Sequence, residues 1–81
     1  MLDKKSSKED SLNIRIGQKV KEEREKRGWS LTELADNSGV SRAMIHKIER
    51  GESSPTAVLL ARLSGSFDMT ISQLLAQTEV Q

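Results

Sequence analysis

Residues 30–51, SLTELADNSGVSRAMIHKIERG, contain the start and end signals of two short helices. Ser30 followed three residues later by Glu33 predicts a capping box, in which each side chain accepts a hydrogen bond from the other residue's backbone N–H. Gly39 predicts the end of the first helix, because glycine adopts a positive φ angle at little cost. Ser41 is a suitable N-cap for the second helix, which the last glycine of the stretch ends. We therefore expect two short helices joined by a tight turn.

The apolar and small residues of this stretch suit two helices that pack closely against each other. Leu34, Ile45 and Ile48 form an inner apolar seam. Ala35 is small where the helices approach, and Val40 fills the space under the turn. This arrangement is that of a helix-turn-helix, whose second helix lies in the major groove of DNA. The alternative is an ordinary helical corner inside a bundle.

The outward face of the second helix, from about Ser41 to Arg50, favours the DNA-binding interpretation. This face carries Arg42, Ala43, His46, Lys47 and Arg50. Arginine and lysine donate hydrogen bonds to guanine edges and to phosphates, and a small methyl group lies between them here. Between Gly39 and Gly51 the one acidic residue is Glu49, which is expected on the other side of the helix.

The rest of the chain predicts three further helices, so the expected fold class is all-α. Apolar residues recur at every fourth position in the segment 12–27, which is the spacing of one helix face. A serine-proline pair at 54–55 predicts the start of a fourth helix that ends near 65–67. Thr70 with Gln73 predicts a capping box at the start of a short fifth helix.

The 81 residues are enough for a single domain. Residues 1–10 are rich in lysine, serine and aspartate and show no periodicity, so we expect a disordered tail. The helix-turn-helix domain is then expected to span residues 11–77, with a frayed C-terminus at 78–81.

Two opposite charges are expected to face the core. Arg24 continues the apolar face of the first helix, and Glu49 lies four residues after Ile45 on the inner seam of the third. Because buried charges persist only when they are paired, we expect a structural ion pair between Arg24 and Glu49 that ties the two helices together. The alternative is that both charges are exposed and belong to no network.

The composition disfavours enzymes, metal sites and membrane proteins. The chain has no cysteine and His46 is its one histidine, so we expect no metal and no cofactor. Glu22, Glu23 and Glu25 lie among basic residues and are expected to form a solvated, ion-paired helix face, not a catalytic acid–base pair. No apolar run suits a membrane span or a signal peptide. We therefore expect a cytoplasmic protein that is not an enzyme.

Several short segments together carry the resemblance to a known family. They are Ile16-Gly17, Gly28-Trp29-Ser30-Leu31, Glu33-Leu34-Ala35, Ser38-Gly39-Val40-Ser41, Ile48-Glu49-Arg50-Gly51 and Ser54-Pro55-Thr56. From Ile16 to Leu75 the chain resembles the DNA-binding domain of lambdoid phage repressors and Cro proteins, also called the xenobiotic-response-element (XRE) family. The resemblance implies a five-helix repressor-like bundle with the third helix in the major groove of double-stranded DNA.

The same resemblance implies two groups of contacts with DNA. Base contacts would fall on Ser41, Arg42, Ala43, His46 and Lys47. Phosphate contacts would fall on Ser30, the backbone of Leu31, Arg50, Ser53, Ser54 and Thr56. Family members differ at the positions of Arg42 and His46, so the operator sequence does not carry over.

The expected function is that of a bacterial or phage transcription regulator, a repressor, that binds an inverted-repeat operator as a homodimer. We expect the dimer of this chain alone to be weak, because most of its apolar surface goes into one core. Part of the region that contains Ile71, Leu74, Leu75 and Val80 would remain for an interface. An antitoxin-type autoregulator that binds DNA and a helical protein-interaction module that does not are the alternatives.

The loop at 51–56 and the region that follows it, 59–75, are similar to bacterial regulators in which this domain precedes a cupin barrel. The similarity implies a sensory domain after this one in a longer protein.

Overall fold

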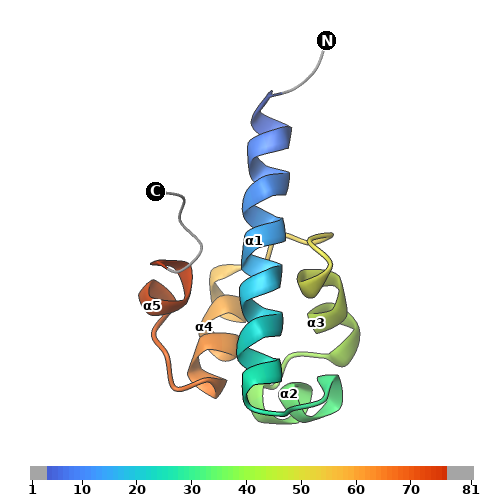
Figure 1. Cartoon of the computed structure of the whole chain (residues 1–81), viewed down its shortest axis with the longest axis vertical. Coiled ribbons are helices and arrows are strands. Elements are labelled where there is room, and N and C mark those ends of the chain that lie inside the picture. Colours follow the sequence, from blue (N-terminus) through green and yellow to red (C-terminus); the bar gives the residue numbers. More distant parts are fainter. Residues whose placement is uncertain (1–3, 77–81) are drawn as a thin grey trace.

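The computed structural model describes the backbone of residues 4–76 and the side chains of residues 11–76. These residues form five α-helices and no strand (Figure 1). The helices are α1 (Lys4–Lys26), α2 (Leu31–Ser38), α3 (Arg42–Glu49), α4 (Ala57–Ser66) and α5 (Ile71–Ala76). The predicted all-α class is confirmed. In this part of the chain no helix is both long enough and apolar enough to cross a membrane.

Helix α1 runs through the middle of the fold, with α3 on one side and α4 and α5 on the other (Figure 1). Every helix and the α2–α3 turn contribute to one core, because each has an apolar side that is removed from water. The buried apolar side chains are Ile16, Val20, Leu34, Val40, Ile45, Ile48, Leu60, Leu63, Phe67 and Leu74. The seam residues of the predicted helix-turn-helix are among them.

Several helix ends follow local signals in the sequence. The capping box of α2 is present: Ser30 Oγ accepts from the Glu33 N–H at 3.0 Å, and Glu33 Oε1 accepts from the Ser30 N–H at 2.8 Å. Gly39 ends α2 with a φ angle of 75°. Ser41 caps α3 with its side chain, and a second capping box begins at Thr70. These ends could be predicted because each depends on residues three or four positions apart.

The start of α1 differs from the prediction. The helix begins at Lys4 and not near Leu12, so residues 4–10, which were expected to be disordered, form its first turns. This segment contains no proline or glycine that would stop a helix, and extending an existing helix costs far less free energy than starting one. The predicted frayed end, 78–81, lies outside the described residues.

The start of α4 also differs from the prediction. Its N-cap is Thr56, whose Oγ1 accepts from the Leu59 N–H at 3.2 Å, and not Ser54. Ser54 Oγ instead accepts a hydrogen bond from Asn13 Nδ2 on α1 at 2.9 Å. Both Ser54 and Thr56 are residue types that cap helices well. Because Asn13, which is distant in sequence, bonds to Ser54, the cap of α4 is Thr56.

Helix α1 approaches α3 so closely at Gly17 that no side chain fits between them. A Cβ atom on Gly17 would overlap the backbone oxygen of Ile48 and lie 2.9 Å from that of Glu49. Both obstacles are backbone atoms, so a bulkier residue could be accommodated only by moving one helix away from the other. Gly17 therefore sets the separation of α1 and α3.

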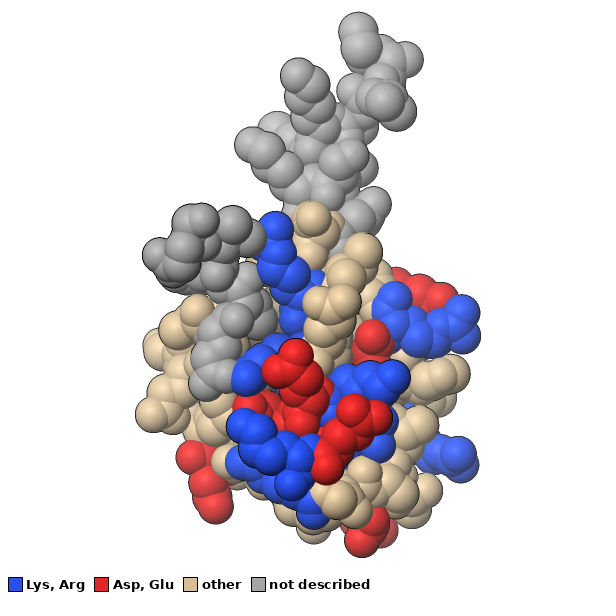
Figure 2. All heavy atoms as spheres, viewed as in Figure 1, with Lys and Arg blue, Asp and Glu red and all other residues tan. Residues whose placement is uncertain are grey.

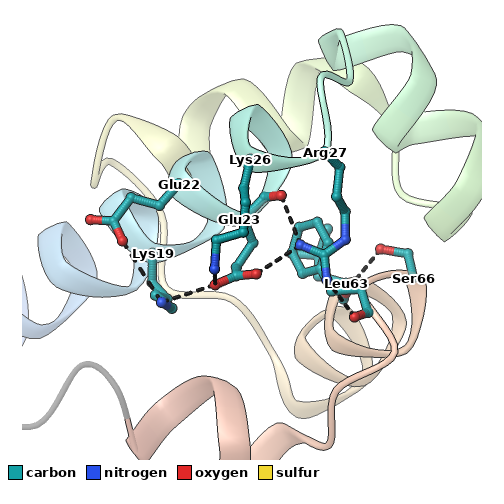
Figure 3. Close-up of polar contacts among 8 residues, drawn as sticks. Lys19, Glu22, Glu23, Lys26, Arg27, Leu63 and Ser66 are labelled. Atoms are coloured by element: carbon teal, nitrogen blue, oxygen red, sulfur yellow. Dashed lines mark hydrogen bonds and ion pairs between the residues drawn. The ribbon is translucent and has the colours of Figure 1, made fainter.

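The prediction that Glu22, Glu23 and Glu25 all lie on a solvated face is wrong for Glu23. Glu22 and Glu25 are exposed, but Glu23 is only 3% exposed. The carboxylate of Glu23 accepts from Lys19, Lys26 and Arg27, at 2.9, 3.2 and 2.7 Å (Figure 3). The neighbouring basic side chains, which were expected to pair with Glu23 on an exposed face, instead pair with it while it is buried.

Arg27 links the charged cluster around Glu23 to Phe67 at the end of α4. Its Nη1 donates to the carboxylate and to the backbone oxygen of Glu23, and its Nη2 donates to the backbone oxygen of Phe67 at 2.7 Å. The guanidinium lies 4.8 Å from the centroid of the Phe67 ring, which stacks against Trp29. Arg27 thus holds the end of α1 against the end of α4.

The cluster lowers the pKa of Glu23. Burial by itself would raise this pKa, but the hydrogen bonds from Arg27, Lys19 and Lys26 outweigh burial and lower it from 4.5 to about 2. The carboxylate is therefore charged in the folded protein at any pH above this value.

Gly17→Ala is expected to reduce the free energy of unfolding by about 3 kcal/mol, because the added methyl group overlaps backbone atoms of α3. Gly65→Ala is the matched control, since Gly65 lies on α4 with no other atom near its missing Cβ. It should instead stabilise the domain by about 0.5 kcal/mol, because alanine loses less backbone entropy. Urea denaturation measures both, and equal effects of the two substitutions would contradict the close approach.

Glu23→Gln is expected to change how stability depends on pH. A carboxyl group whose pKa is lowered by folding stabilises the protein above its unfolded pKa and ceases to do so as pH falls through the folded pKa. Between pH 5 and 2 the wild-type domain should therefore lose up to about 3 kcal/mol that Glu23→Gln does not lose. Denaturation at a series of pH values tests this, with exposed Glu22→Gln as the control. A constant difference between wild type and Glu23→Gln across this range would contradict it.

Candidate nucleic-acid interface

The corner between α2 and α3 is held by hydrogen bonds from both sides. The Gly39 N–H donates to the Ala35 oxygen at 2.9 Å, and the Val40 N–H donates to Ser38 Oγ at 3.1 Å. Arg62 on α4 donates from Nη1 to the Gly39 oxygen at 3.3 Å. These contacts fix the direction in which α3 leaves the turn, so the two helices form the expected helix-turn-helix.

The residues predicted to contact bases are all exposed at α3 or its N-cap. They are Ser41, Arg42, Ala43, His46 and Lys47. The Ser41 hydroxyl already accepts a hydrogen bond from the Met44 N–H at 3.1 Å, as the helix cap. The opposite side of α3 is buried through Ile45 and Ile48, so the exposed side of the helix faces away from the core.

An open hollow lies where the start of α2 meets the exposed side of α3. Leu31, Arg42, Ala43 and His46 line it. The half-buried Leu31 and the small Ala43 leave this space open between two polar side chains. The hollow brings one residue predicted to contact phosphate next to three predicted to contact bases.

The residues predicted to contact phosphates come from three segments around α3. Ser30 and Leu31 begin α2, Arg50 is the C-cap of α3, and Ser53, Ser54 and Thr56 belong to the following loop. Ser53 Oγ lies 3.7 Å from Met44 Sδ, which holds that loop against α3. The hydroxyls of Ser30, Ser54 and Thr56 accept hydrogen bonds within the protein, which leaves each hydroxyl proton available for a phosphate oxygen.

No pattern in the sequence predicts a role for Glu52. In the structure its Oε2 lies 2.8 Å from Nη2 of Arg50, a predicted phosphate contact. Two charges separated by one residue are common in sequences and carry no periodic signal. The pair becomes visible only once the end of α3 is placed in space.

The structure brings Arg24 and Glu49 together as a two-pronged ion pair. Arg24 Nε lies 2.7 Å from Glu49 Oε2, and Arg24 Nη2 lies 3.0 Å from Glu49 Oε1. The side chains are 12% and 6% exposed. Arg24 also donates from Nη1 to the backbone oxygen of Trp29 at 2.9 Å. The hydrogen bonds with Glu49 raise the pKa of Arg24 above its usual value, although burial opposes this.

The helix-turn-helix family HTH_3 matches residues 20–74, which is more than half of the chain. The chain belongs to the HTH_3 family. The match includes α2, α3 and α4 in full and the last turns of α1, so it covers the whole helix-turn-helix and both partners of the Arg24–Glu49 pair. The predicted XRE and Cro-type resemblance and the DNA-binding class of the domain are confirmed at the level of the family.

Similar curated proteins are transcription regulators. SutR of Escherichia coli K12 is 42% identical to this HTH_3 domain over 57 residues, which are 70% of this chain and 32% of SutR. SinR of Bacillus subtilis is 36% identical over 61 residues, which are 74% of this chain and 55% of SinR. The chain thus spans about a third of SutR and about half of SinR.

Solved structures share the arrangement of the helices. An HTH_3 family transcriptional regulator from Vibrio cholerae superimposes with a TM-score of 0.79 at 36% identity, over 85% of this chain and 39% of that one. The restriction-modification controller protein C.AhdI from Aeromonas hydrophila gives a TM-score of 0.73 at 29% identity, over 76% of this chain and 94% of that one. This HTH_3 domain therefore shares its fold with a transcriptional regulator and a controller protein of known structure.

Among the described residues no group of three or more His, Cys, Asp and Glu side chains could hold a metal ion. The chemistry of the α3 surface is that of hydrogen-bond donors, a histidine and small side chains.

Glu49→Ala is expected to reduce the free energy of unfolding by about 3 to 5 kcal/mol, because it leaves the Arg24 guanidinium buried without its charge partner. The double variant Arg24→Met/Glu49→Leu should recover most of this loss, since an apolar pair of similar volume avoids the cost of burying charge. Chemical denaturation measures both. A loss near zero for Glu49→Ala would show that the pair contributes nothing to stability.

Proposed function

We propose that this HTH_3 domain binds double-stranded DNA in a sequence-specific way, with α3 in the major groove, as part of a transcription regulator. The observation that carries the proposal is the contrast between the two sides of α3. One side is buried through Ile45 and Ile48, and the other exposes Arg42, His46 and Lys47. A helix anchored in this way presents donors to base edges without exposing its apolar seam.

The charge distribution supports α3 as the DNA-binding side. Over the lower half of α1, the basic side chains of Lys and Arg lie among acidic side chains, which are those of Glu in this part of the helix (Figure 2). There Glu23 is held by three cations, and Glu22 lies 3.7 Å from Lys19. Acids and bases largely cancel on that side, whereas on the exposed side of α3 the residues 41–48 include no acid. A polyanion is attracted to the second kind of surface.

The contacts divide into two groups with different consequences. Ser41, Arg42, Ala43, His46 and Lys47 are proposed to face base edges. Ser30, the backbone of Leu31, Arg50, Ser53, Ser54 and Thr56 are proposed to face phosphates. Phosphate contacts position the domain on the duplex and carry no sequence information, while base contacts select the site.

We further propose that the regulator represses transcription as a dimer on an inverted repeat, with each α3 in one half-site. Dimeric helix-turn-helix proteins place their half-sites about one helical turn apart. Because this chain spans only part of SutR and SinR, a further sensory domain of the cupin type stays a prediction, as does the cytoplasmic location.

Arg42→Ala and Arg50→Ala are expected to weaken DNA binding differently. Selection of bound sites from a random duplex pool would first define the half-site and its spacing. On that site Arg42→Ala should cost roughly 1 to 3 kcal/mol and relax the preference at one base position. Arg50→Ala should weaken operator and scrambled duplex alike and flatten the dependence of log K on log salt by about one unit, because phosphates do not differ between sequences.

Lys26→Ala is the matched control for charge. Lys26 is 66% exposed and lies nine residues after Gly17, which is about half a turn around α1 from the side that meets α3. It should leave both duplexes unaffected. If wild type shows no salt-sensitive binding to any duplex, the domain is a protein-interaction module. If Arg42→Ala weakens both duplexes equally and leaves the preferred base unchanged, Arg42 contacts phosphate.

A further inference from the structure

The exposed end of α3 carries an acid beside a cation proposed to bind phosphate. Arg50 and Glu52 form an ion pair at 2.8 Å, with side chains 59% and 49% exposed. Of the acids in the segment 41–52, Glu49 is buried against Arg24, so Glu52 is the exposed one. A carboxylate in this place opposes the approach of a polyanion.

Arg50 lies in line with the proposed base-contacting residues. It follows Ala43 by seven residues and His46 by four, spacings that place all three on one side of a helix. The charge that Glu52 neutralises therefore belongs to the exposed side of α3. Among residues 41–50 the basic side chains are Arg42, Lys47 and Arg50, so Glu52 offsets one of three.

The backbone keeps Glu52 next to Arg50. The Gly51 N–H donates to the Ile48 oxygen and the Glu52 N–H donates to the Lys47 oxygen, both at 3.0 Å, which is the Schellman pattern at a helix end. Gly51 has a φ angle of 74°, and a Cβ there would lie 2.7 Å from Ile14 Cγ1 on α1. The backbone at the start of the loop is thus fixed on two sides, and the exposed side chain of Glu52 is free to move away from Arg50.

We infer that Glu52 is an internal competitor for DNA phosphate: its carboxylate occupies Arg50 in the free protein and lowers the affinity for every duplex. The inference rests on the proposed function, because it requires a phosphate at Arg50. The Glu52 carboxylate takes the Nη2 donor of Arg50 and offsets its charge, so a phosphate that approaches this donor competes with the carboxylate for it. An exposed pair of this kind is weak, and a phosphate held in place by neighbouring contacts can displace it. Glu52 thus limits binding that depends on phosphates alone and leaves base contacts to distinguish the operator.

Glu52→Gln is the direct test, since it keeps the size of the side chain and removes the charge. Binding to operator and scrambled duplex should become about fivefold tighter at low salt, and the salt dependence should steepen by up to about one unit. In an Arg50→Ala background the gain should shrink markedly, because no guanidinium is released. Glu22→Gln removes an exposed acid on α1 and should change neither duplex. Unchanged circular dichroism would exclude an effect through folding.

The other results overturn the inference. If Glu52→Gln weakens binding, Glu52 positions Arg50 for DNA and does not compete with it. If affinity is unchanged, or if the gain is the same with and without Arg50, Glu52 acts at most through its general charge. These outcomes leave the proposed function intact as long as wild type binds duplex DNA. Absence of salt-sensitive binding by wild type overturns both.

Discussion

The contact between α1 and α3 is the constraint on which the rest of the structure depends. At Gly17 the two helices are close enough that backbone meets backbone, and about two turns further along α1 Arg24 holds Glu49 through two hydrogen bonds. The first contact fixes the distance between the helices, and the second fixes how far α3 can slide or rotate. A side chain at position 17 would force the helices apart, and loss of either partner of the pair would remove the second constraint.

This constraint also determines what α3 exposes. With Ile45 and Ile48 buried and Glu49 paired with α1, the opposite side of the helix must face solvent. The side chains exposed there include Arg42, His46, Lys47 and Arg50. The corner with α2 is fixed independently, by the left-handed Gly39 and by Arg62 of α4. Rigid supports on both sides allow a helix of only eight residues to hold its side chains in one orientation.

Three acids in this small domain show how surroundings decide what a carboxylate does. Glu49 is buried and pairs with one arginine. Glu23 is buried and pairs with three cations, whose hydrogen bonds lower its pKa to about 2. Glu52 is exposed and shares a weak pair with Arg50. Removing one partner from either of the first two would leave a buried charge unpaired, whereas the third can exchange its partner because solvent screens it.

The sequence by itself determined the elements that depend on near neighbours. The capping box at Ser30, the left-handed glycine at position 39 and the inward seam of α3 each need residues only three or four positions apart, so their patterns could be recognised in the chain. The positions of Arg24 and Glu49 could be recognised in the same way, since each charge interrupts an apolar stripe of its own helix, and the need to pair buried charges then predicted a contact between residues 25 positions apart. Only the tertiary structure decided that Glu23 is buried, that Thr56 and not Ser54 caps α4, and that Glu52 meets Arg50. Glu23 is covered by Arg27, which the backbone oxygen of Phe67 holds in place, and Ser54 is engaged by Asn13 of α1. The position of Glu52 depends on the turn at Gly51, which packs against Ile14. These contacts come from distant parts of the chain or from backbone geometry, and whether a charge is buried depends on the groups that cover it.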